Sequence, residues 1–253
     1  MIVPKDYPIL EYDTARSAVI EPSMKKLILP ADKLVITFFP EVIEAMLAEG
    51  TVRKAFEISG ENIVVLYSFA DRPDILLTLG YIGCPACAGN LDMLHAMGIE
   101  KVMFCGGGGV LDKSIAVGEL LVVKGAIRDE GFSYHYLEPS RIVYADSRVT
   151  EAIVEYLSER GIPHLSGLTW TTDAIFRETG ERIALRRAEG ARIVEMEQAG
   201  CLAVAQYRGF AYGAIIYGGD DVSQPEWDSR DWRSRNGIRY DLVTLCHELV
   251  QRI

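Results

Sequence analysis

Short apolar runs of strand length alternate along the chain with longer segments whose apolar residues recur at helical spacing. Residues 63–69 and 211–217 are nearly continuous apolar runs, which are typical of buried strands. Apolar residues in 39–49 recur every three or four positions, which predicts a helix. The full pattern predicts strands at 26–30, 63–69, 76–80, 101–105, 118–123 and 211–217, and helices at 39–49, 83–97, 148–160, 189–207 and 240–253.

Strands separated by segments of helical length are typical of an α/β fold. We therefore predict a single domain over residues 1–253, with a central mixed, mostly parallel β-sheet flanked by helices. Residues 223–236 are polar, carry Trp227, Trp232 and several arginines, and are long for a simple connection. Two interpretations of this segment stay open, a surface loop and a gate over a site.

Composition and charge narrow the classes of function. The 253 residues have a formal net charge of −10 without a dense basic run, which argues against nucleic acid as a partner. No apolar run approaches the roughly 20 residues of a membrane helix, and residues 1–10 lack a signal-peptide pattern. We therefore expect no membrane partner and a cytoplasmic location. The scattered cysteines indicate reduced thiols, and the dispersed histidines predict no metal site.

Two pairs of acidic residues lie in apolar surroundings. Glu195 and Glu197 fall on the first turns of the predicted helix 189–207, and Asp220 and Asp221 follow the predicted strand 211–217. Carboxylates are rarely buried without polar partners, so an apolar wall that carries two of them suits a polyhydroxylated ligand such as a sugar. The alternatives are solvated glutamates and aspartates that only cap a turn.

The predicted strand 101–105 leads into four consecutive glycines, residues 106–109. Glycines at the end of a strand allow the backbone to approach a ligand and to direct N–H groups at an anion or a base. A tight turn needs only one or two glycines, which favours a ligand cradle, and a packing turn is the alternative.

With these segments in place, the chain resembles the nucleoside phosphorylase superfamily, which includes purine nucleoside phosphorylase, uridine phosphorylase and methylthioadenosine nucleosidase. The resemblance implies an enzyme, a pentosyltransferase, that cleaves the N-glycosidic bond of a nucleoside with phosphate as cosubstrate and without a cofactor. It also implies a homo-oligomer, either a dimer or a hexamer. The segments that carry the resemblance are 80–83, 106–109, 117–122, 171–176 and 194–197.

The resemblance implies a role for each residue of the Glu-Met-Glu segment. Glu197 is expected to hydrogen-bond the ribose hydroxyls and Met196 to pack beneath the sugar, with Glu195 either binding the ribose or supporting the site. Cleavage passes through a sugar with oxocarbenium character, and a carboxylate on its hydroxyls favours the developing positive charge over the neutral ground state.

Asp220 matches the family's aspartate that protonates or hydrogen-bonds a purine leaving group, so we expect it to be the catalytic acid and the base to be a purine. A uridine-type phosphorylase is the alternative. Trp170 and Phe176 are candidates to stack on the base, although aromatic residues beside a strand more often belong to the core. The expected base-binding residues are Gly108, Gly109, Thr172, Ile175, Phe176 and Val194.

The positions that hold phosphate in the family depart from its pattern. Phe104 replaces the arginine before the glycines, Gly107 replaces a serine or threonine, and the first loop, at 30–35, has Val35 instead of arginine. Each missing charge-assisted contact is worth roughly 1.5–3 kcal/mol. The candidates to replace them are Lys33, Arg53, Arg72 and an arginine of a neighbouring subunit.

Three functions are therefore open. A phosphorylase that transfers ribose to phosphate through relocated cations is the first hypothesis. A nucleosidase that uses water in the same place, with Asp32 near the water, is the second. A nucleoside-binding protein without turnover is the third.

Overall fold

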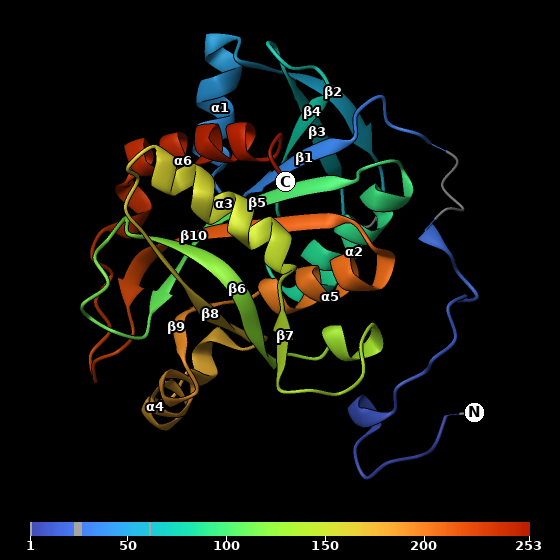
Figure 1. Ribbon diagram of the computed structural model, residues 1–253, viewed down its shortest axis with the longest axis vertical. Helices are drawn as coiled ribbons and strands as arrows, with labels where there is room; N and C mark the ends of the chain where they lie inside the picture. Colours follow the sequence, from blue (N-terminus) through green and yellow to red (C-terminus); the bar gives the residue numbers. More distant parts are fainter. Residues whose placement is uncertain (1, 23–26, 61) are drawn as a thin grey trace.

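The computed structural model of the chain describes residues 2–22, 27–60 and 62–253. Its centre is a ten-stranded mixed β-sheet with helices packed on both faces (Figure 1). The strands are β1 (Lys33–Thr37), β2 (Val52–Ile58), β3 (Val64–Phe69), β4 (Ile75–Leu79), β5 (Lys101–Val110), β6 (Leu120–Asp129), β7 (Ile142–Tyr144), β8 (His164–Thr172), β9 (Ala191–Glu195) and β10 (Ala211–Asp221). The α-helices are α1 (Pro40–Glu49), α2 (Cys84–Ala96), α3 (Ser147–Glu159), α4 (Gly180–Ala188), α5 (Gln198–Arg208) and α6 (Asn236–Leu249), and short 3₁₀ helices are η1 (Pro8–Leu10), η3 (Ser133–His135), η4 (Ile175–Arg177) and η5 (Trp232–Ser234).

Strand β5 joins the two parts of the sheet. β1 and β10 pair in parallel with its first part, on opposite sides, so that Lys33 and Ala211 both lie opposite Lys101. Beyond the end of β1, the antiparallel β9 takes the same side of β5, with Val194 opposite Gly109. Strands β10, β6, β8, β9 and β5 therefore form a closed circuit, from which β1, β4, β3 and β2 extend as an open sheet.

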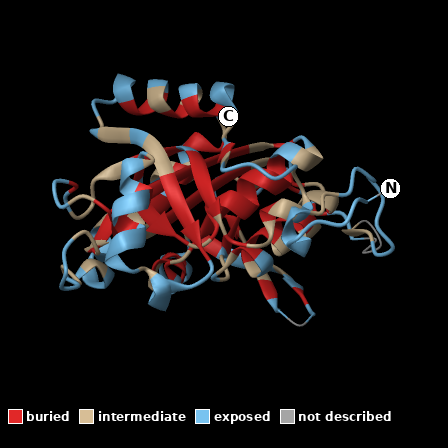
Figure 2. Ribbon diagram, turned by 90° about the horizontal axis from the view of Figure 1, so that it is seen from below, coloured by how far each residue is buried: buried red, intermediate tan, exposed pale blue. Residues whose placement is uncertain are grey.

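The helices form two layers around the strands. α1, α3 and α6 contribute Val42, Ile153 and Leu242 to the cluster on one face, and α2 and α5 contribute Leu91 and Leu202 to the cluster on the other. Figure 2 shows buried strands in the middle of the molecule and exposed residues on the outer sides of the helices. The end of β5 is thus enclosed by its neighbouring strands and by both helical layers.

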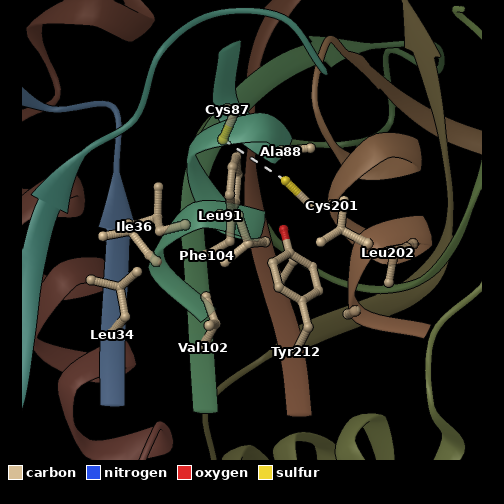
Figure 3. Packing of buried hydrophobic residues seen from close by; sticks show 14 of the residues in the cluster. Leu34, Ile36, Cys87, Ala88, Leu91, Val102, Phe104, Cys201, Leu202 and Tyr212 are labelled. Carbon is tan, nitrogen blue, oxygen red and sulfur yellow. Dashed lines mark hydrogen bonds between the residues drawn. The ribbon is translucent and has the colours of Figure 1, made fainter. Parts of the chain in front are cut away.

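The cluster under α2 and α5 includes residues that the sequence singled out for chemistry (Figure 3). Phe104 of β5 is buried in this cluster together with Ile36 and Leu91. Cys87 of α2 faces Cys201 of α5, with 3.8 Å between their Sγ atoms. Burial raises the pKa of the Cys201 thiol well above its ordinary value, so this thiol is a packing group rather than a reactive one.

The predicted α/β class with a mixed sheet is confirmed, with parallel and antiparallel pairings in equal number among the described residues. The predicted first strand at 26–30 is wrong where it can be compared. Residues 27–30 form no strand, and Lys26 lies outside the described residues. The strand is β1, so the turn after it consists of Phe38 and Phe39, and the second half of the predicted first loop at 30–35 belongs to the strand.

Two further predictions are corrected by the structure. The segment 189–207 is not one helix, because β9 runs to Glu195 and α5 begins only at Gln198. The four glycines do not form a turn, because all of them lie within β5 and pair with β10 or β9. Strands β2, β7 and β8 and helix α4 were not predicted. β2 lies at the edge of the sheet, and most of its residues are exposed, so its pattern lacks a continuous apolar run.

Candidate active site

Several of the predicted site residues lie where β5 ends. Val194 of β9 lies opposite Gly109 of β5, and Gly218 of β10 lies opposite Gly108. The two acidic segments of the sequence, one following β9 and the other ending β10, therefore flank the same two glycines from opposite sides. This arrangement follows from the closed circuit of strands, which the sequence pattern did not predict.

A β-bulge presents Asp220. The register of β10 against β5 shifts between Gly218 and Asp221, so Gly219 and Asp220 together occupy the space opposite one β5 residue. A bulge bends the strand and changes the direction in which a side chain points. Asp220 is accordingly half-buried, whereas Asp221 is buried.

The two neighbouring aspartates have different partners. Nε1 of Trp227 donates a hydrogen bond to Oδ2 of Asp220 at 2.6 Å. Oδ1 of Asp221 accepts the backbone N–H of Ser223 at 2.8 Å, and its backbone pairs with Asp228. The turn-capping interpretation therefore applies to Asp221. Asp220 makes no such backbone contact within the described part of the chain.

Glu178 is a candidate site residue that the sequence analysis missed. Burial, and then the charge of Asp220, raise the pKa of Glu178 to about 7. A cavity of about 610 Å³ separates α4 from the segment after β10, and Gly180 and Val222 line its two walls. Glu178 lies two residues before Gly180 in the chain, and Asp220 lies two residues before Val222. A single glutamate in a polar segment gives no sequence signal that would have identified it.

Glu195 is occupied by contacts within the protein. Its Oε1 accepts the hydroxyl of Thr171, and its Oε2 accepts the backbone N–H groups of Glu197 at 2.5 Å and Gln198 at 2.7 Å. Thr171 Oγ1 in turn accepts the N–H of Ala199 at 2.9 Å. These contacts satisfy the first N–H groups of α5. Of the two roles that the sequence left open for Glu195, the contacts favour support of the site over direct ribose binding.

Glu197 lies at the N-cap of α5 and is 7% exposed. Its Oε1 accepts the backbone N–H of Gly83, at the entrance to α2, at 2.8 Å, and its Oε2 is 3.3 Å from the N–H of Met196. The side chain of Met196 is half-buried beside it. The loop before α2 thus fixes the carboxylate, and both oxygens retain a free lone pair for a ligand hydroxyl.

The two glutamates form a coupled pair with raised pKa values. Burial raises the pKa of Glu195 to about 7, and burial together with the charge of Glu195 raises the pKa of Glu197 to about 8, from an ordinary value of 4.5. Near neutral pH the pair therefore retains a proton that the same residues lose in the unfolded chain.

We expect this pair to make the folded chain less stable as the pH rises from 5 to 8. Below pH 4.5 both states bind the protons, and at higher pH only the folded state keeps them, so the free energy of unfolding falls by roughly 2–4 kcal/mol. Urea unfolding of the native protein and of Glu197→Gln across this range measures the effect. The difference between the two pH curves isolates the pair, and two parallel curves would contradict the prediction.

The β5 glycines are required by packing. A Cβ atom on Gly108 would lie 2.4 Å from Cγ2 of Ile193 and 2.5 Å from the backbone oxygen of Val194. A Cβ atom on Gly109 would lie 3.0 Å from Cγ1 of Val194, which is buried. Of the residues expected to bind the base, Gly108, Gly109 and Val194 therefore lie together at the junction of β5 with β9.

Gly108→Ala is expected to destabilise the fold by about 1–3 kcal/mol, because the neighbouring backbone has no space for the added methyl group. Gly89→Ala is the matched control. Gly89 lies inside α2 with no atom within 4 Å of an added Cβ, so alanine there should raise stability by about 0.5–1 kcal/mol. Urea unfolding measures both changes, and equal stability of the two variants would contradict this account of the glycines.

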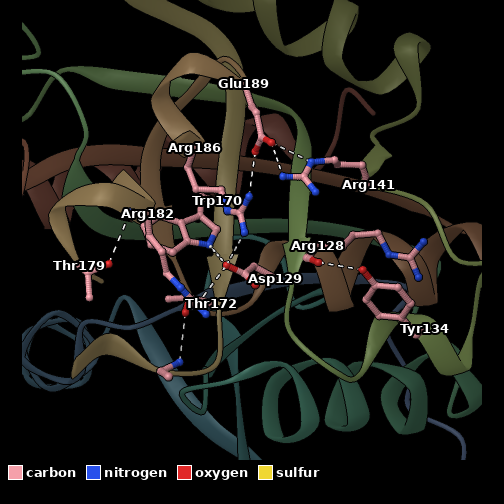
Figure 4. Close-up of polar contacts among 11 residues, drawn as sticks. Arg128, Asp129, Tyr134, Arg141, Trp170, Thr172, Thr179, Arg182, Arg186 and Glu189 are labelled. Carbon is pink, nitrogen blue, oxygen red and sulfur yellow. Dashed lines mark hydrogen bonds and ion pairs between the residues drawn. The ribbon is translucent and has the colours of Figure 1, made fainter. Parts of the chain in front are cut away.

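The remaining aromatic and hydroxyl candidates are divided between the core and the surface. Trp170 is completely buried, and its Nε1 donates to Oδ2 of Asp129 at 3.0 Å (Figure 4). The interpretation of Trp170 as a core residue is confirmed. Thr172 is also buried, and its Oγ1 accepts the N–H of Ala174 at 3.2 Å. Phe176 is 95% exposed and does not belong to the core, so its stacking on a base stays a prediction.

Ile175 and Phe176 face outward because both lie in η4, the short turn after β8. Ile175 is 54% exposed. Neither side chain is enclosed with Val194 and the glycines, so the base-binding role expected of this turn is not supported by its position in one chain.

None of the cations named from the sequence lies beside Gly107. Arg53 is on β2, at the far edge of the sheet, with β3, β4 and β1 between it and β5. Lys33 begins β1, at the other end of the strand, where it pairs with Asp32 and Asp74, and Arg72 pairs with the same Asp74. The proposed roles of Arg53 in phosphate binding and of Asp32 beside a water therefore do not fit these positions.

Aromatic residues occupy the region around the expected phosphate position. Phe38, in the turn after β1, lies 5.2 Å from Phe104 between ring centroids. The ring of Trp232 lies close to Gly107 on the opposite face of β5. One buried cation, Arg239 of α6, lies behind this ring, with 5.3 Å between Cζ and the Trp232 ring centroid. The sequence analysis did not consider Arg239, which is distant in the chain from every motif.

In the described part of the chain, no group of three or more His, Cys, Asp or Glu side chains is arranged to hold a metal ion. The helices of the same residues include none with the length and apolar character needed to cross a membrane.

Comparison with known proteins places the site within a family. A family model described as "Phosphorylase superfamily" matches residues 32–239. The chain is 28% identical to a guanosine phosphorylase of Halorubrum lacusprofundi over 145 residues, which are 57% of this chain and 60% of that protein. It is 31% identical to a uridine phosphorylase of Thermococcus kodakarensis over 106 residues, which are 42% of this chain and 38% of that protein. The matches thus span less than two thirds of these relatives.

Solved structures share the fold. A purine nucleoside phosphorylase from Toxoplasma gondii in complex with immucillin-H aligns with a TM-score of 0.70 and 20% identity, over 87% of this chain and 92% of that chain. A uridine phosphorylase from Vibrio fischeri ES114 aligns with a TM-score of 0.73 and 17% identity, over 90% of this chain and 99% of that chain.

Proposed function

Because the chain belongs to the phosphorylase superfamily, we propose that it cleaves the N-glycosidic bond of a nucleoside and transfers the ribosyl group to phosphate. The observation that carries the proposal is that β9, which ends two residues before Glu197, and β10, which contains Asp220, pair with β5 from opposite sides at Gly108 and Gly109. In a nucleoside bound between the two carboxyl groups, Glu197 lies at the ribose hydroxyls and Asp220 lies at the base.

In the proposed reaction Glu197 binds the ribose hydroxyls and Met196 packs beneath the ring. The C–N bond breaks with its electron pair going to the base, positive charge develops on the sugar, and a phosphate oxygen bonds to the anomeric carbon. In its ionised form, which predominates above its pKa of about 8, Glu197 favours this transition state over the neutral substrate. Asp220 donates a proton to the leaving base. Glu178, with its pKa raised to about 7, keeps a proton close to Asp220 near neutral pH.

A purine is the proposed base, because an aspartate at position 220 suits protonation of a purine nitrogen. The test is base release from inosine, guanosine, adenosine, methylthioadenosine and uridine, each with and without phosphate. We expect release from at least one of the purine nucleosides, dependent on phosphate. Cleavage of uridine alone would overturn the purine assignment, and binding without any release would favour a nucleoside-binding protein.

Hydrolysis is the second candidate function, and the aromatic residues near Gly107 favour it. Phe104 stands where the resemblance expects a phosphate-binding arginine, and water needs no such neutralisation. In that case water takes the place of the phosphate oxygen and the sugar product is ribose. Release of base at equal rates with and without phosphate would establish this candidate.

We also propose that the chain acts as a homo-oligomer, a dimer or a hexamer, in the cytoplasm. Exposed apolar side chains support assembly, since Val19 is 94% exposed, Ile20 81% and Phe176 95%. Light scattering should give a multiple of the 28.1 kDa chain mass, and a monomer at assay concentration would contradict the proposal.

A further inference from the structure

We propose that the ring of Trp232, which lies over Gly107, occupies the phosphate position, must leave before phosphate binds, and so controls which acceptor reaches the sugar. The inference rests on the proposed cleavage of a nucleoside at this site. It assigns a specificity-determining role to a residue outside the segments that carry the family resemblance.

The position of the ring is defined by two glycines. A Cβ atom on Gly107 would lie 2.6 Å from Cζ3 of Trp232, and a Cβ atom on Gly219 would lie 3.0 Å from its Cδ2. The indole therefore covers the ends of β5 and β10 together. Gly107 is the position at which the resemblance places a phosphate-binding serine or threonine, so the ring fills the space into which such a side chain would reach.

Trp232 is held by a short chain of polar contacts. Tyr217 Oη donates to the backbone oxygen of Trp232 at 3.0 Å, and Arg239 Nε donates to Tyr217 Oη at 2.9 Å. Arg239 Nη1 also binds Oε1 of Glu41 at 2.7 Å, and its Cζ lies 4.9 Å from the centroid of Phe39. The guanidinium is thus enclosed by aromatic rings and paired with one carboxylate.

The backbone before Trp232 is strained. Arg230 and Asp231 have φ values of 48° and 50°, a left-handed conformation that residues other than glycine rarely adopt. The Arg230 side chain fastens this segment through hydrogen bonds to the backbone oxygens of Gly219, at 2.8 Å from Nε, and Ile115, at 2.8 Å from Nη1. A strained segment held by one side chain is suited to exchange between a closed and an open position.

Removal of the ring changes the chemistry of the space that it fills. With Trp232 in place, the end of β5 presents aromatic carbon, which does not compensate the desolvation of an anion. With Trp232 displaced, the backbone at Gly107 and the cation of Arg239 border the vacated space, and a guanidinium is well suited to bind phosphate. The closed position therefore admits water, and the open position admits phosphate.

The test is the affinity for inorganic phosphate, measured by calorimetry without nucleoside. We expect Trp232→Ala to bind phosphate at least tenfold more tightly than the native protein, and Trp232→Phe, which keeps a ring over Gly107, to remain close to native. Equal dissociation constants for the native protein and Trp232→Ala would overturn the inference. Circular dichroism and urea unfolding verify that the variants are folded.

A second measurement uses the native sequence at position 232. In a Trp227→Phe background, phosphate should change the fluorescence of Trp232, because displacement alters the surroundings of its ring, whereas the other remaining tryptophan, Trp170, is fully buried. Saturating phosphate without any change in fluorescence would contradict displacement of the ring. The inference fails separately from the proposed function. Suppose that the native protein releases base at the same rate with and without phosphate, while Trp232→Ala binds phosphate tightly. This result would reject phosphorolysis by the native protein but would still support the role of Trp232.

Discussion

Glu197→Gln is expected to lower kcat/KM for nucleoside cleavage by about 10²–10³-fold, the usual cost of removing one group that stabilises transition-state charge. Glutamine keeps the shape of the side chain and an oxygen that can accept the N–H of Gly83, which binds the glutamate at 2.8 Å. It cannot ionise, so it lacks the negative charge with which the ionised form of Glu197, predominant above a pKa of about 8, favours the oxocarbenium character of the sugar. Steady-state kinetics with the best substrate of the nucleoside panel measures the loss.

The matched control is Glu181→Gln, in the exposed first turn of α4. It makes the same chemical change on the surface and should leave kcat/KM unchanged. If Glu197→Gln and Glu181→Gln behave alike, Glu197 does not bind the ribose in the transition state.

Asp220→Asn is expected to lower kcat for purine nucleosides by about 10²–10⁴-fold while KM changes little, because the amide cannot deliver a proton to the base. The amide oxygen can still accept the indole N–H of Trp227, which lies 2.6 Å from the aspartate, so the loop should keep its position. The substrate that isolates proton transfer is p-nitrophenyl riboside, because its leaving group departs without protonation. Asp220→Asn should cleave it at close to the native rate.

Asp221→Asn serves as the control for the neighbouring aspartate. Asp221 is buried and its side chain accepts the backbone N–H of Ser223, so the change should affect stability more than kcat. A loss of activity on both substrates in Asp220→Asn would show that the carboxyl group positions the sugar or the loop instead of acting as an acid.

Local patterns in the sequence predicted the elements that surround the site, but not how they join. The apolar runs of β3 and β10 and the helical spacing of α1 were sufficient to identify these elements. β9 was hidden because its apolar residues run directly into those of α5, and periodicity cannot separate a short buried strand from the helix that follows it. Without β9 the closed circuit is not visible, and neither is the position of the two acidic segments on opposite sides of β5.

The roles of the two glutamates also required the structure. Glu195 and Glu197 have the same side chain and similar apolar neighbours in the sequence. Only the contacts show that Glu195 accepts hydrogen bonds from the start of α5. Glu197 instead accepts them from Gly83, in the loop before α2, and from the neighbouring Met196.

The phosphate region was the least predictable part of the site. The error in the first strand moved the expected first loop to residues 30–35 and hid Phe38, which follows β1. Trp232 and Arg239 come from the C-terminal part of the chain and reach Gly107 only through tertiary packing. The long polar segment 223–236 left a surface loop and a gate open as interpretations, and its sequence does not indicate that Trp232 lies over Gly107.

The measurement that tests the account most directly is identification of the sugar product by ³¹P NMR while base release is followed in the same sample. With excess phosphate, the account predicts ribose 1-phosphate in equal amounts to the free base, and loss of both products together in Glu197→Gln. Free ribose with the phosphate signal unchanged would contradict it, and would identify water as the acceptor at this site.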